Sequence, residues 1–381
     1  MEYNTIKNVN LKGKTILLRV DLNSEIKNGK VVLSDRIIKH AETIKFLKNK
    51  KAKVVVLAHQ GRKDERDFLS LKQHCKLLNK FVKIGFVDDI IGAKAVSEIK
   101  NLREGNAILL ENVRFLKEED DLNLKNKFVK TLSEILDYYI NDALSICHRE
   151  QASIVSFPKI IPGFIGPVLE EELENIKKIK IENSLLILGG AKIENNLISL
   201  SKRGSEVLPG GLFAPLVSIS RGINLGEENK ILKNEIKFSK VIKGNKKIIS
   251  PLDFAVEING KREEFNISEF PKNYKILDIG KKTIEEYKKI ISKSKNIFMR
   301  GTVGYCEDDK FSLGTYEILK AIKNSSARTF VAGGNTLIAI KRFGMNKKDF
   351  DYISLSGGAL VEYLIGGKLP GLEVLKKVKN V

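Results

Sequence analysis

Charged and amide side chains, with arginines prominent among them, recur at or shortly after the ends of short apolar runs in the first half of the chain. They are Arg19, Asp21 and Asn23; Arg36; His59, Gln60, Gly61 and Arg62; Glu111, Asn112 and Arg114; Asn141 and Asp142; and His148 and Arg149. Arginine presents a planar set of donors that binds two oxygens of a carboxylate or phosphate at once. One such arginine is most simply a surface ion pair. Several at successive strand ends predict a small substrate with more than one negative charge.

The second half carries glycine-rich loops in place of arginines. They are Gly189-Gly190-Ala191-Lys192, Gly210-Gly211, Gly301 to Gly304, Gly333-Gly334-Asn335-Thr336 and Gly357-Gly358. Most follow an apolar run and precede a helical pattern. Glycine lets the backbone approach a ligand closely, and helix N-termini favour phosphate. One glycine pair can simply form a turn, but the whole set predicts a nucleotide or polyphosphate site.

Short apolar runs alternating with amphipathic stretches are expected to position these residues. The predicted strands are Thr15–Val20, Val54–Ala58, Ala107–Leu110, Tyr138–Ile140, Leu185–Leu188, Ile248–Ser250, Asn296–Met299, Thr329–Ala332 and Tyr352–Leu355. The predicted helices include Asp35–Lys48, Leu124–Leu136, Thr283–Lys293 and Thr315–Ile322. Runs that are apolar throughout are typical of strands covered on both faces. The alternation predicts an α/β fold with two doubly wound parallel-sheet domains, whose ligands lie at the carboxyl ends of the strands.

The length of 381 residues favours two domains over one. Prolines and glycines interrupt residues 158–167, and a charged helical pattern follows over Val168–Lys180 before strands resume at Leu185. We therefore expect an N-terminal domain over 1–165, a connecting helix over 166–181, a C-terminal domain over 182–360 and a C-terminal segment over 361–381.

Composition excludes several classes of protein. No apolar run approaches the length of a membrane span and the N-terminus lacks an apolar signal core, which favours a cytoplasmic protein without membrane contact. The cysteines Cys75, Cys147 and Cys306 lack metal-site spacing. The net charge of +20 permits nucleic-acid binding, but the lysines are scattered and tryptophan is absent, which argues against it. The sequence contains no P-loop, dinucleotide or protein-kinase motif, and it does not determine the oligomeric state.

The short motifs together resemble the phosphoglycerate kinase family. In chain order they read RVDLN, SDRI, AHQGR, LLENVRF, YINDA, HREQAS, LGGAK, LDIGKKT, GTVGYCE, AGGNT, SGGA and GKLPGLEVL. They extend to Leu375, and the AHQGR and HREQAS forms resemble the archaeal branch. The resemblance implies phosphoryl transfer from ATP to the carboxylate of 3-phosphoglycerate, giving ADP and 1,3-bisphosphoglycerate, in glycolysis and gluconeogenesis. It also implies Mg²⁺, hinge closure and a C-terminal segment that returns to the N-terminal domain.

The resemblance assigns residues to each role. Substrate binding falls on Asp21, Asn23, Arg36, His59, Gln60, Gly61, Arg62, Arg114 and Arg149. Nucleotide binding falls on Gly189, Gly190, Ala191, Lys192, Gly211, Arg300, Gly304, Glu307, Gly333, Gly334, Asn335 and Thr336. Arg36, Lys192 and the backbone of Gly358 are the expected catalytic groups, since phosphoryl transfer needs positioning and charge neutralisation more than covalent chemistry.

The nucleotide set departs from the family pattern, whereas the substrate set does not. Asn196 replaces a second lysine, Asn335 replaces a magnesium-binding aspartate, and Arg300 and Thr302 replace an asparagine and a proline. One interpretation is that Arg300 restores the charge lost at Asn196 and that phosphate oxygens and water hold most of the Mg²⁺. The other is a weakened enzyme or a non-catalytic phosphoglycerate-binding protein.

Overall fold

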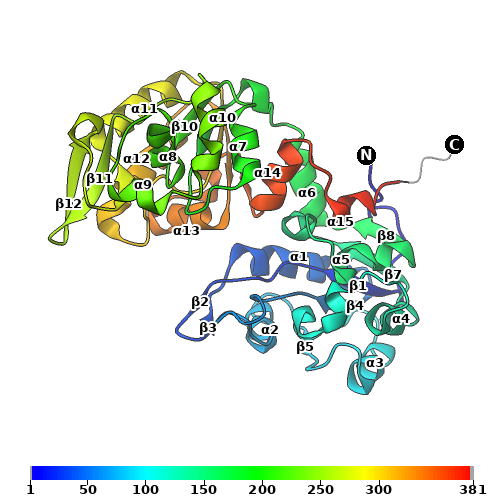
Figure 1. Ribbon diagram of the computed structural model, residues 1–381. Coiled ribbons are helices and arrows are strands. Elements are labelled where there is room, and N and C mark those ends of the chain that lie inside the picture. Colours follow the sequence, from blue (N-terminus) through cyan, green and yellow to red (C-terminus); the bar gives the residue numbers. More distant parts are fainter. Residues whose placement is uncertain (1, 378–381) are drawn as a thin grey trace. The chain divides into compact units, whose positions relative to one another are not determined.

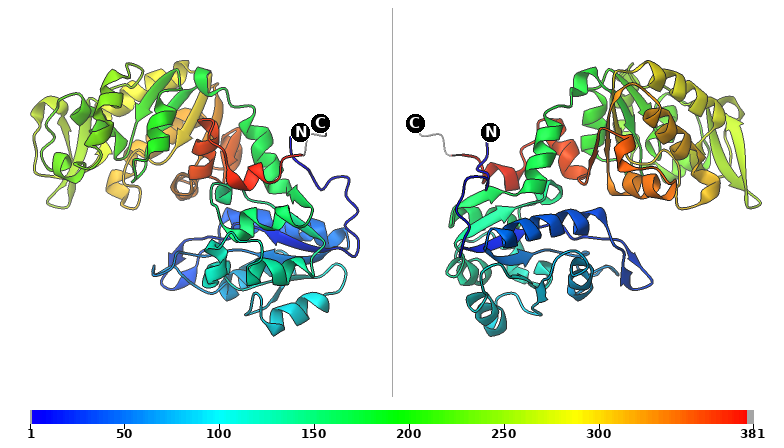
Figure 2. Two further views of the ribbon diagram at one scale, coloured as in Figure 1. Left: turned by 45° about the vertical axis from the view of Figure 1, so that its right-hand side comes forward. Right: turned by 180° about the vertical axis from the view of Figure 1, so that it is seen from behind.

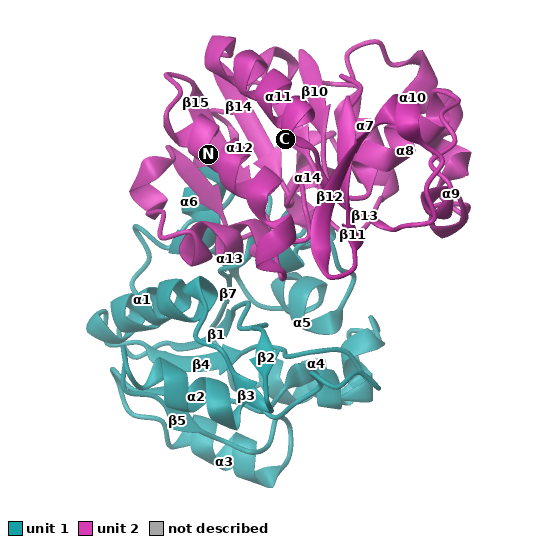
Figure 3. Ribbon diagram, turned by 90° about the vertical axis from the view of Figure 1, so that its left-hand side faces the viewer, with its two compact units in different colours: residues 1–174, 368–381 teal, residues 175–367 magenta. Residues whose placement is uncertain are grey.

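The computed structural model describes residues 2–377, which form two compact units. Unit 1 comprises Met1–Glu174 and Lys368–Val381, and unit 2 comprises Asn175–Gly367 (Figure 3). The chain therefore crosses from one unit to the other twice, and the second crossing follows Gly367. No helix within residues 2–377 is both long and apolar enough to cross a membrane.

Unit 1 is built on a six-stranded sheet in the order β5-β6-β4-β1-β7-β8, in which every pairing is parallel (Figure 1). The strands are β1 (Thr15–Arg19), β4 (Lys53–Leu57), β5 (Gly85–Phe86), β6 (Ala107–Leu109), β7 (Tyr138–Asn141) and β8 (Gly163–Ile165). The sequence did not predict the edge strands β5 and β8, because each is very short and contains glycine. A small antiparallel pair, β2 (Ile26–Lys27) and β3 (Lys30–Val31), lies outside this sheet.

Helices pack on both faces of the unit 1 sheet. Alternate strand residues such as Ile16 and Leu18 share one core with α1 (Asp35–Asn49) and α2 (Lys72–Leu78). On the other side, Phe157 contacts Phe128 of α4 (Lys127–Ser133) and stacks on Tyr139 of β7. Predicted helix 124–136 is shortened to α4 because the Asn126 side chain accepts from the Val129 N–H and caps the first turn. Two further helices of this unit are α3 (Ala93–Lys100) and α5 (Ala152–Val155).

Unit 2 has a five-stranded parallel sheet in the order β10-β9-β14-β15-β16. Its strands are β9 (Leu185–Leu188), β10 (Glu206–Pro209), β14 (Asn296–Arg300), β15 (Arg328–Ala332) and β16 (Tyr352–Ser354). Its helices are α7 (Asn195–Ser201), α8 (Phe213–Ser220), α9 (Glu227–Ile231), α10 (Ser239–Gly244), α11 (Lys281–Lys293), α12 (Leu313–Lys323), α13 (Gly334–Arg342) and α14 (Gly358–Leu364). Parallel strands alternating with helices in both units confirm the predicted fold class.

An antiparallel sheet in unit 2 was not predicted. It has the order β12-β11-β13, with β11 (Asp253–Ile258), β12 (Lys261–Asn266) and β13 (Ile276–Ile279), and it lies at the far end of the unit from α14 (Figures 1 and 2). Asn259 and Gly260 turn the hairpin with positive φ, which is the strongest short-range hairpin signal. The predicted strand Ile248–Ser250 is wrong, because Ile248 makes only an isolated bridge to Val207.

The C-terminal segment belongs to unit 1. Helix α15 (Pro370–Glu373) contacts α5, and the Gly371 N–H donates to the Cys147 carbonyl at 2.9 Å. Lys376 forms an isolated antiparallel β-bridge with Tyr3. This confirms the predicted return to the N-terminal domain. The predicted segment 361–381 nevertheless begins inside α14, which packs on α7 in unit 2. Residues 378–381 lie outside the described residues. The connecting helix is α6 (Pro167–Ile176), shorter than the predicted 166–181.

Candidate active site

The first-half residues lie at the carboxyl ends of β1, β4, β6 and β7, which are neighbours in the sheet. Asp21 and Asn23 follow β1, and the Gly61 N–H after β4 donates to Asn23 Oδ1 at 2.9 Å. The Gly61 carbonyl accepts from Arg114, which follows β6. Gly61 therefore connects the loops from three strands, and its φ of +68° beside the Asp67 backbone leaves no room for a side chain.

Buried Asp21 and partly exposed Arg36 form an ion pair beside this junction. Arg36 Nη1 lies 3.1 Å from Asp21 Oδ2 and donates to the Asn23 carbonyl at 3.0 Å. Burial alone would raise the pKa of Asp21, but the Arg36 charge and hydrogen bonds from Ser145 and the Asn23 N–H outweigh it and hold the pKa well below its ordinary value. The carboxylate is therefore ionised at neutral pH and fixes the Arg36 guanidinium in place.

A basic cavity of about 570 Å³ opens next to these strand ends. Arg62, Lys63, Arg114, Lys117 and Arg149 line it, together with Phe68, Phe115, Leu116, Glu119, Asp120 and Gln151. Burial, and then repulsion from Arg149 and Arg19, lowers the pKa of Arg114 to about 10, and burial and Arg62 lower that of Arg149. Both guanidiniums remain charged at neutral pH, and their mutual repulsion makes the cavity a site for an anion.

Four members of the predicted substrate set are buried in this structure: Asp21, His59, Gln60 and Gly61. Gln60 has no exposed surface, and its side-chain amide binds Ser24, His74 and the Asp67 carbonyl, so it supports the loop after β4 rather than reaching the cavity. His59 is also buried, with Nδ1 3.4 Å from Arg19 Nη2. Burial, followed by the Arg19 charge, lowers the pKa of His59 well below its ordinary value, so the ring is neutral at pH 7.

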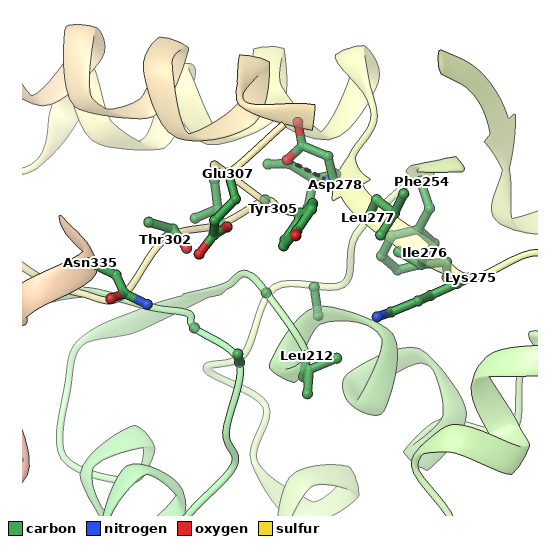
Figure 4. Close-up of a pocket in the computed structure, with 17 residues that line it drawn as sticks. Leu212, Phe254, Lys275, Ile276, Leu277, Asp278, Thr302, Tyr305, Glu307 and Asn335 are labelled. Atoms are coloured by element: carbon green, nitrogen blue, oxygen red, sulfur yellow. Dashed lines mark hydrogen bonds between the residues drawn. The ribbon is translucent and has the colours of Figure 1, made fainter. Parts of the chain in front are cut away.

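Unit 2 contains a pocket of about 250 Å³ at the carboxyl ends of its parallel strands. Its lining residues are Gly190, Ala191, Gly211, Leu212, Ala214, Phe254, Lys275, Ile276, Leu277, Asp278, Ile279, Thr302, Val303, Gly304, Tyr305, Glu307 and Asn335. Asn335 lies at one end and Lys275 at the other, with Glu307 and Tyr305 between them (Figure 4). An apolar end, a carboxylate and a polar end match a base, a sugar and phosphates in that order.

The glycines around this pocket serve two different purposes. A Cβ on Gly211 or Gly301 would lie 2.4 Å or 2.3 Å from a neighbouring glycine carbonyl oxygen, and one on Gly189 would lie 2.2 Å from the Thr302 carbonyl oxygen. These glycines therefore let the loops after β9, β10 and β14 pack on one another. Gly334, Gly357 and Gly358 instead face open space. The lack of a side chain therefore permits loop packing at the first three positions and leaves open space at the other three.

The other predicted nucleotide residues surround the pocket without lining it. Gly333 has φ +101° and precedes α13, whose first turn carries Gly334, Asn335 and Thr336. Thr336 is buried and accepts from the Gly301 N–H at 3.1 Å, so it joins α13 to the loop after β14. Lys192 is exposed on the loop after β9.

Arg300 is held by an acidic residue that the sequence did not single out. Its Nη2 lies 3.5 Å from Glu194 Oε2, and only 16% of its side chain is exposed. Burial lowers the pKa of Arg300 and the Glu194 charge opposes that change. Glu194 precedes α7, on the loop that also carries Lys192.

Asp278 lines the pocket and stabilises its wall through hydrogen bonds. Its carboxylate accepts from Arg262 at 2.8 Å and from the Gly314 and Ile279 N–H groups. Burial raises its pKa to about 6, against the opposing effect of Arg262. A Cβ on Gly304 would lie 2.2 Å from Asp278 Oδ1, so the loop after β14 rests directly on this carboxylate.

The donor set in unit 2 fits a magnesium ion that arrives with a nucleotide. Within residues 2–377 no cluster of three or more His, Cys, Asp or Glu could hold a metal. The Asn335 amide is one neutral oxygen at the polar end of the pocket. Mg²⁺ keeps several waters and relies on substrate phosphates, so a single weak protein ligand is compatible with it.

Sequence reasoning missed residues of both sites. Lys63, Lys117 and Glu119 line the basic cavity, but their charged neighbours in sequence made them look like ordinary surface residues. Leu212, Phe254 and Lys275 line the second pocket. The LDIGKKT motif marked the strand β13 beside Lys275, but an apolar pocket wall carries no charge pattern by which it could be found.

Comparisons with known proteins agree with this geometry. The family model described as phosphoglycerate kinase matches residues 6–367. The phosphoglycerate kinase of Methanothermus fervidus is 37% identical, with 100% of this chain and 98% of the relative covered. That of Sulfurisphaera tokodaii is 37% identical, covering 97% and 95%. Both are archaeal, in agreement with the branch that the AHQGR and HREQAS motifs indicated.

Solved structures show the same similarity. The crystal structure of phosphoglycerate kinase from Pyrococcus horikoshii superposes with a TM-score of 0.90 at 33% identity, covering 98% of each chain. The structure of phosphoglycerate kinase from Coxiella burnetii has a TM-score of 0.78 at 30% identity, also covering 98% of each chain. The likeness extends over both units.

Proposed function

The chain belongs to the phosphoglycerate kinase family, and we propose that it divides the two substrates between its units, with phosphoglycerate in unit 1 and the adenine nucleotide in unit 2. The enzyme transfers a phosphoryl group reversibly between ATP and the carboxylate of 3-phosphoglycerate, giving ADP and 1,3-bisphosphoglycerate. The observation that carries the division is the convergence of Arg62, Arg114 and Arg149 on one cavity in unit 1.

In unit 1 the cavity binds the phosphate of 3-phosphoglycerate. Arg114 and Arg149 each provide a guanidinium fork whose donors match phosphate oxygens. Asp21, Asn23 and Arg36 hold the hydroxyacid end. The first two follow β1, Arg36 on α1 is paired with Asp21, and Gly61 joins Asn23 to Arg114 of the cavity. This arrangement leaves the substrate carboxylate near Arg36.

In unit 2 the apolar end of the pocket holds the base and Glu307 accepts from the ribose hydroxyls. The phosphates lie toward Asn335 and the first turn of α13, where backbone N–H groups and the helix dipole favour anions. Lys192 contacts the outer phosphates from the loop after β9. Arg300 takes part when phosphate displaces Glu194 from it.

The transfer needs no side-chain base, since the acceptor carboxylate is already ionised. A carboxylate oxygen forms the new bond to the γ-phosphorus while the bond to the β–γ bridging oxygen breaks, leaving ADP. Arg36 and Lys192 stabilise the charge on the equatorial oxygens in the transition state, and the Gly358 N–H adds a donor. We propose that hinge closure brings the substrates together and excludes water from the acyl phosphate.

Magnesium fits this scheme as part of the nucleotide complex. Asn335 is the residue of this chain that would hold it, through the amide oxygen at the polar end of the pocket. The ion supplies neutralisation of the phosphate charge. The alternative of a non-catalytic phosphoglycerate-binding protein rests only on Asn196, Arg300 and Asn335.

A coupled assay tests the function and the division together. ATP-dependent formation of 1,3-bisphosphoglycerate is read through a dehydrogenase, and its absence would refute catalysis. Arg149→Ala should raise the KM for 3-phosphoglycerate at least tenfold and leave ADP binding unchanged. The matched control is Arg66→Ala, an exposed arginine on the loop after β4 that does not line the cavity. Equal effects of the two substitutions would contradict the assignment of unit 1.

A further inference from the structure

A buried carboxylate lies in the wall of the basic cavity. Glu119 is on the turn Lys117–Asp120 between β6 and α4, lines the cavity, and is only 1% exposed. A carboxylate is an unexpected lining residue for a cavity that binds anions, because it repels them. Its position therefore calls for a role other than direct contact with the substrate.

The Glu119 carboxylate is connected to a buried arginine through one serine. Ser153 donates to it twice, from the backbone N–H at 2.9 Å and from the hydroxyl at 2.6 Å. The same hydroxyl oxygen accepts from Arg19 Nε at 2.9 Å. Arg19 is 1% exposed and also approaches His59. This series of hydrogen bonds joins the cavity wall to the strand end that carries Asp21.

The charged and titratable groups that interact with Glu119 come from its own turn and from three other elements. They are Arg19 on β1, Arg114 on the turn after β6, Tyr139 on β7 and Asp120 on its own turn. Burial raises the pKa of Glu119 to about 7, while Arg19 and the bonds from Ser153 oppose the change. The group is therefore close to balanced between its ionised and protonated forms at neutral pH.

Resting on the assignment of phosphoglycerate to unit 1, we propose that Glu119 is the counter-ion of the arginine cavity in the free enzyme and takes up a proton when the anionic substrate binds. A phosphate near Arg114 and Arg149 supplies the negative charge that Glu119 otherwise provides. Repulsion between the phosphate and the carboxylate at low local dielectric then drives a proton from solvent onto Glu119.

Ser153 accommodates both forms of the carboxyl group. Its hydroxyl donates to the ionised carboxylate. When Glu119 is protonated, the carboxyl O–H donates to the same hydroxyl oxygen, whose second lone pair still accepts from Arg19. The arginine orientation is therefore retained in either form, and Glu119 acts as a positioning residue whose charge is exchanged for that of the substrate.

Calorimetric titration of the full-length protein with 3-phosphoglycerate tests the proposal. Titrations at pH 7 in two buffers of different ionisation enthalpy give the number of protons taken up. A group with a pKa of about 7 is half protonated there, so Glu119 contributes about half a proton per site. Glu119→Gln should remove that contribution, and the difference between variants cancels the titration of the substrate phosphate. Glu118→Gln, one residue away and outside the cavity lining, should keep the wild-type value.

The same proton number in wild type and a folded Glu119→Gln variant would overturn the proposal. If that variant does not fold, difference infrared spectroscopy on the wild-type enzyme decides: adding 3-phosphoglycerate should produce a carboxylic acid band and remove carboxylate absorption, and no such band would overturn it. If 3-phosphoglycerate binds but the wild type and Glu119→Gln take up the same number of protons, only this inference is refuted. If the wild-type protein does not bind 3-phosphoglycerate, the proposed function is refuted instead.

Discussion

Replacing Gly301 with alanine should destabilise the packing between the loops that form the nucleotide pocket. Gly301 follows β14 with φ +82°, and an added Cβ would lie 2.3 Å from the Gly189 carbonyl oxygen. The left-handed conformation costs an alanine about 1–2 kcal/mol. Forcing the two loops apart costs about 1–3 kcal/mol more, as overpacking does in cores. The free energy of unfolding of unit 2 should therefore fall by about 3 kcal/mol.

Gly344 provides the matched control for backbone strain alone. It lies two residues after the end of α13 with φ +67°, and a Cβ there would meet nothing within 4 Å. Gly344→Ala should cost only about 1–2 kcal/mol. Scanning calorimetry separates the two variants, because about 1 kcal/mol shifts the melting temperature of a unit of this size by about 2–4 °C. ADP affinity should fall for Gly301→Ala, because forcing the two loops apart displaces Gly190, which lines the pocket. For Gly344→Ala it should stay at the wild-type value.

Gly334 tests the other kind of glycine. Its Cβ would face open space at the start of α13, so Gly334→Ala should leave the melting temperature unchanged while weakening ADP binding, because the methyl group occupies the approach of the phosphates. Equal melting temperatures for Gly301→Ala and Gly344→Ala would refute the loop-packing argument. Wild-type ADP affinity in Gly334→Ala would refute the claim that this glycine faces the ligand.

Three further predictions concern the nucleotide unit. Arg300→Asn should raise the KM for ATP and lower kcat. Glu194→Gln should lower the KM for ATP, because it frees Arg300 from the ion pair at 3.5 Å. Unchanged constants in steady-state kinetics would contradict both expectations. Asn335→Asp should lower the free Mg²⁺ needed for half-maximal rate, since a carboxylate binds a hard cation better than an amide, and a magnesium titration checks this. Asp278 has a folded pKa of about 6, above its ordinary value of 3.8, so its stabilising contribution is complete below pH 3.8 and is lost as the pH rises through 6. Between pH 5 and pH 7, calorimetry should show a smaller loss of stability for Asp278→Asn than for the wild type. A larger loss for the variant would contradict the direction of the Asp278 pKa shift.

The sequence predicted the parallel sheets because their strands are covered on both faces and therefore read as apolar throughout. Thr15–Val20 and Leu185–Leu188 are examples, and the strands there match closely. The antiparallel strands at 253–279 were missed although Asn259-Gly260 marks a hairpin turn, because β12 is mostly charged and carries little apolar signal. The observed helix ends also differ from the predicted ones where a side chain such as Asn126 caps the backbone.

The residue types at strand ends were determined by the sequence itself. Parallel strands place their carboxyl ends at one edge, so Arg62, Arg114 and Arg149 could be expected together before any coordinates, and they line one cavity. Only the tertiary structure decided which side chains face that cavity. Gln60 is enclosed by its own hydrogen bonds, and Glu119 lies in the wall.

The same division holds for the glycines of unit 2. The sequence determined where the backbone lacks side chains, but it could not tell Gly301, which packs against another loop, from Gly334, which faces open space. Local sequence determines which conformations a residue can adopt and which chemistry it can perform. Burial and the room around an atom depend on segments distant in the chain, and for that reason only the folded structure decided them.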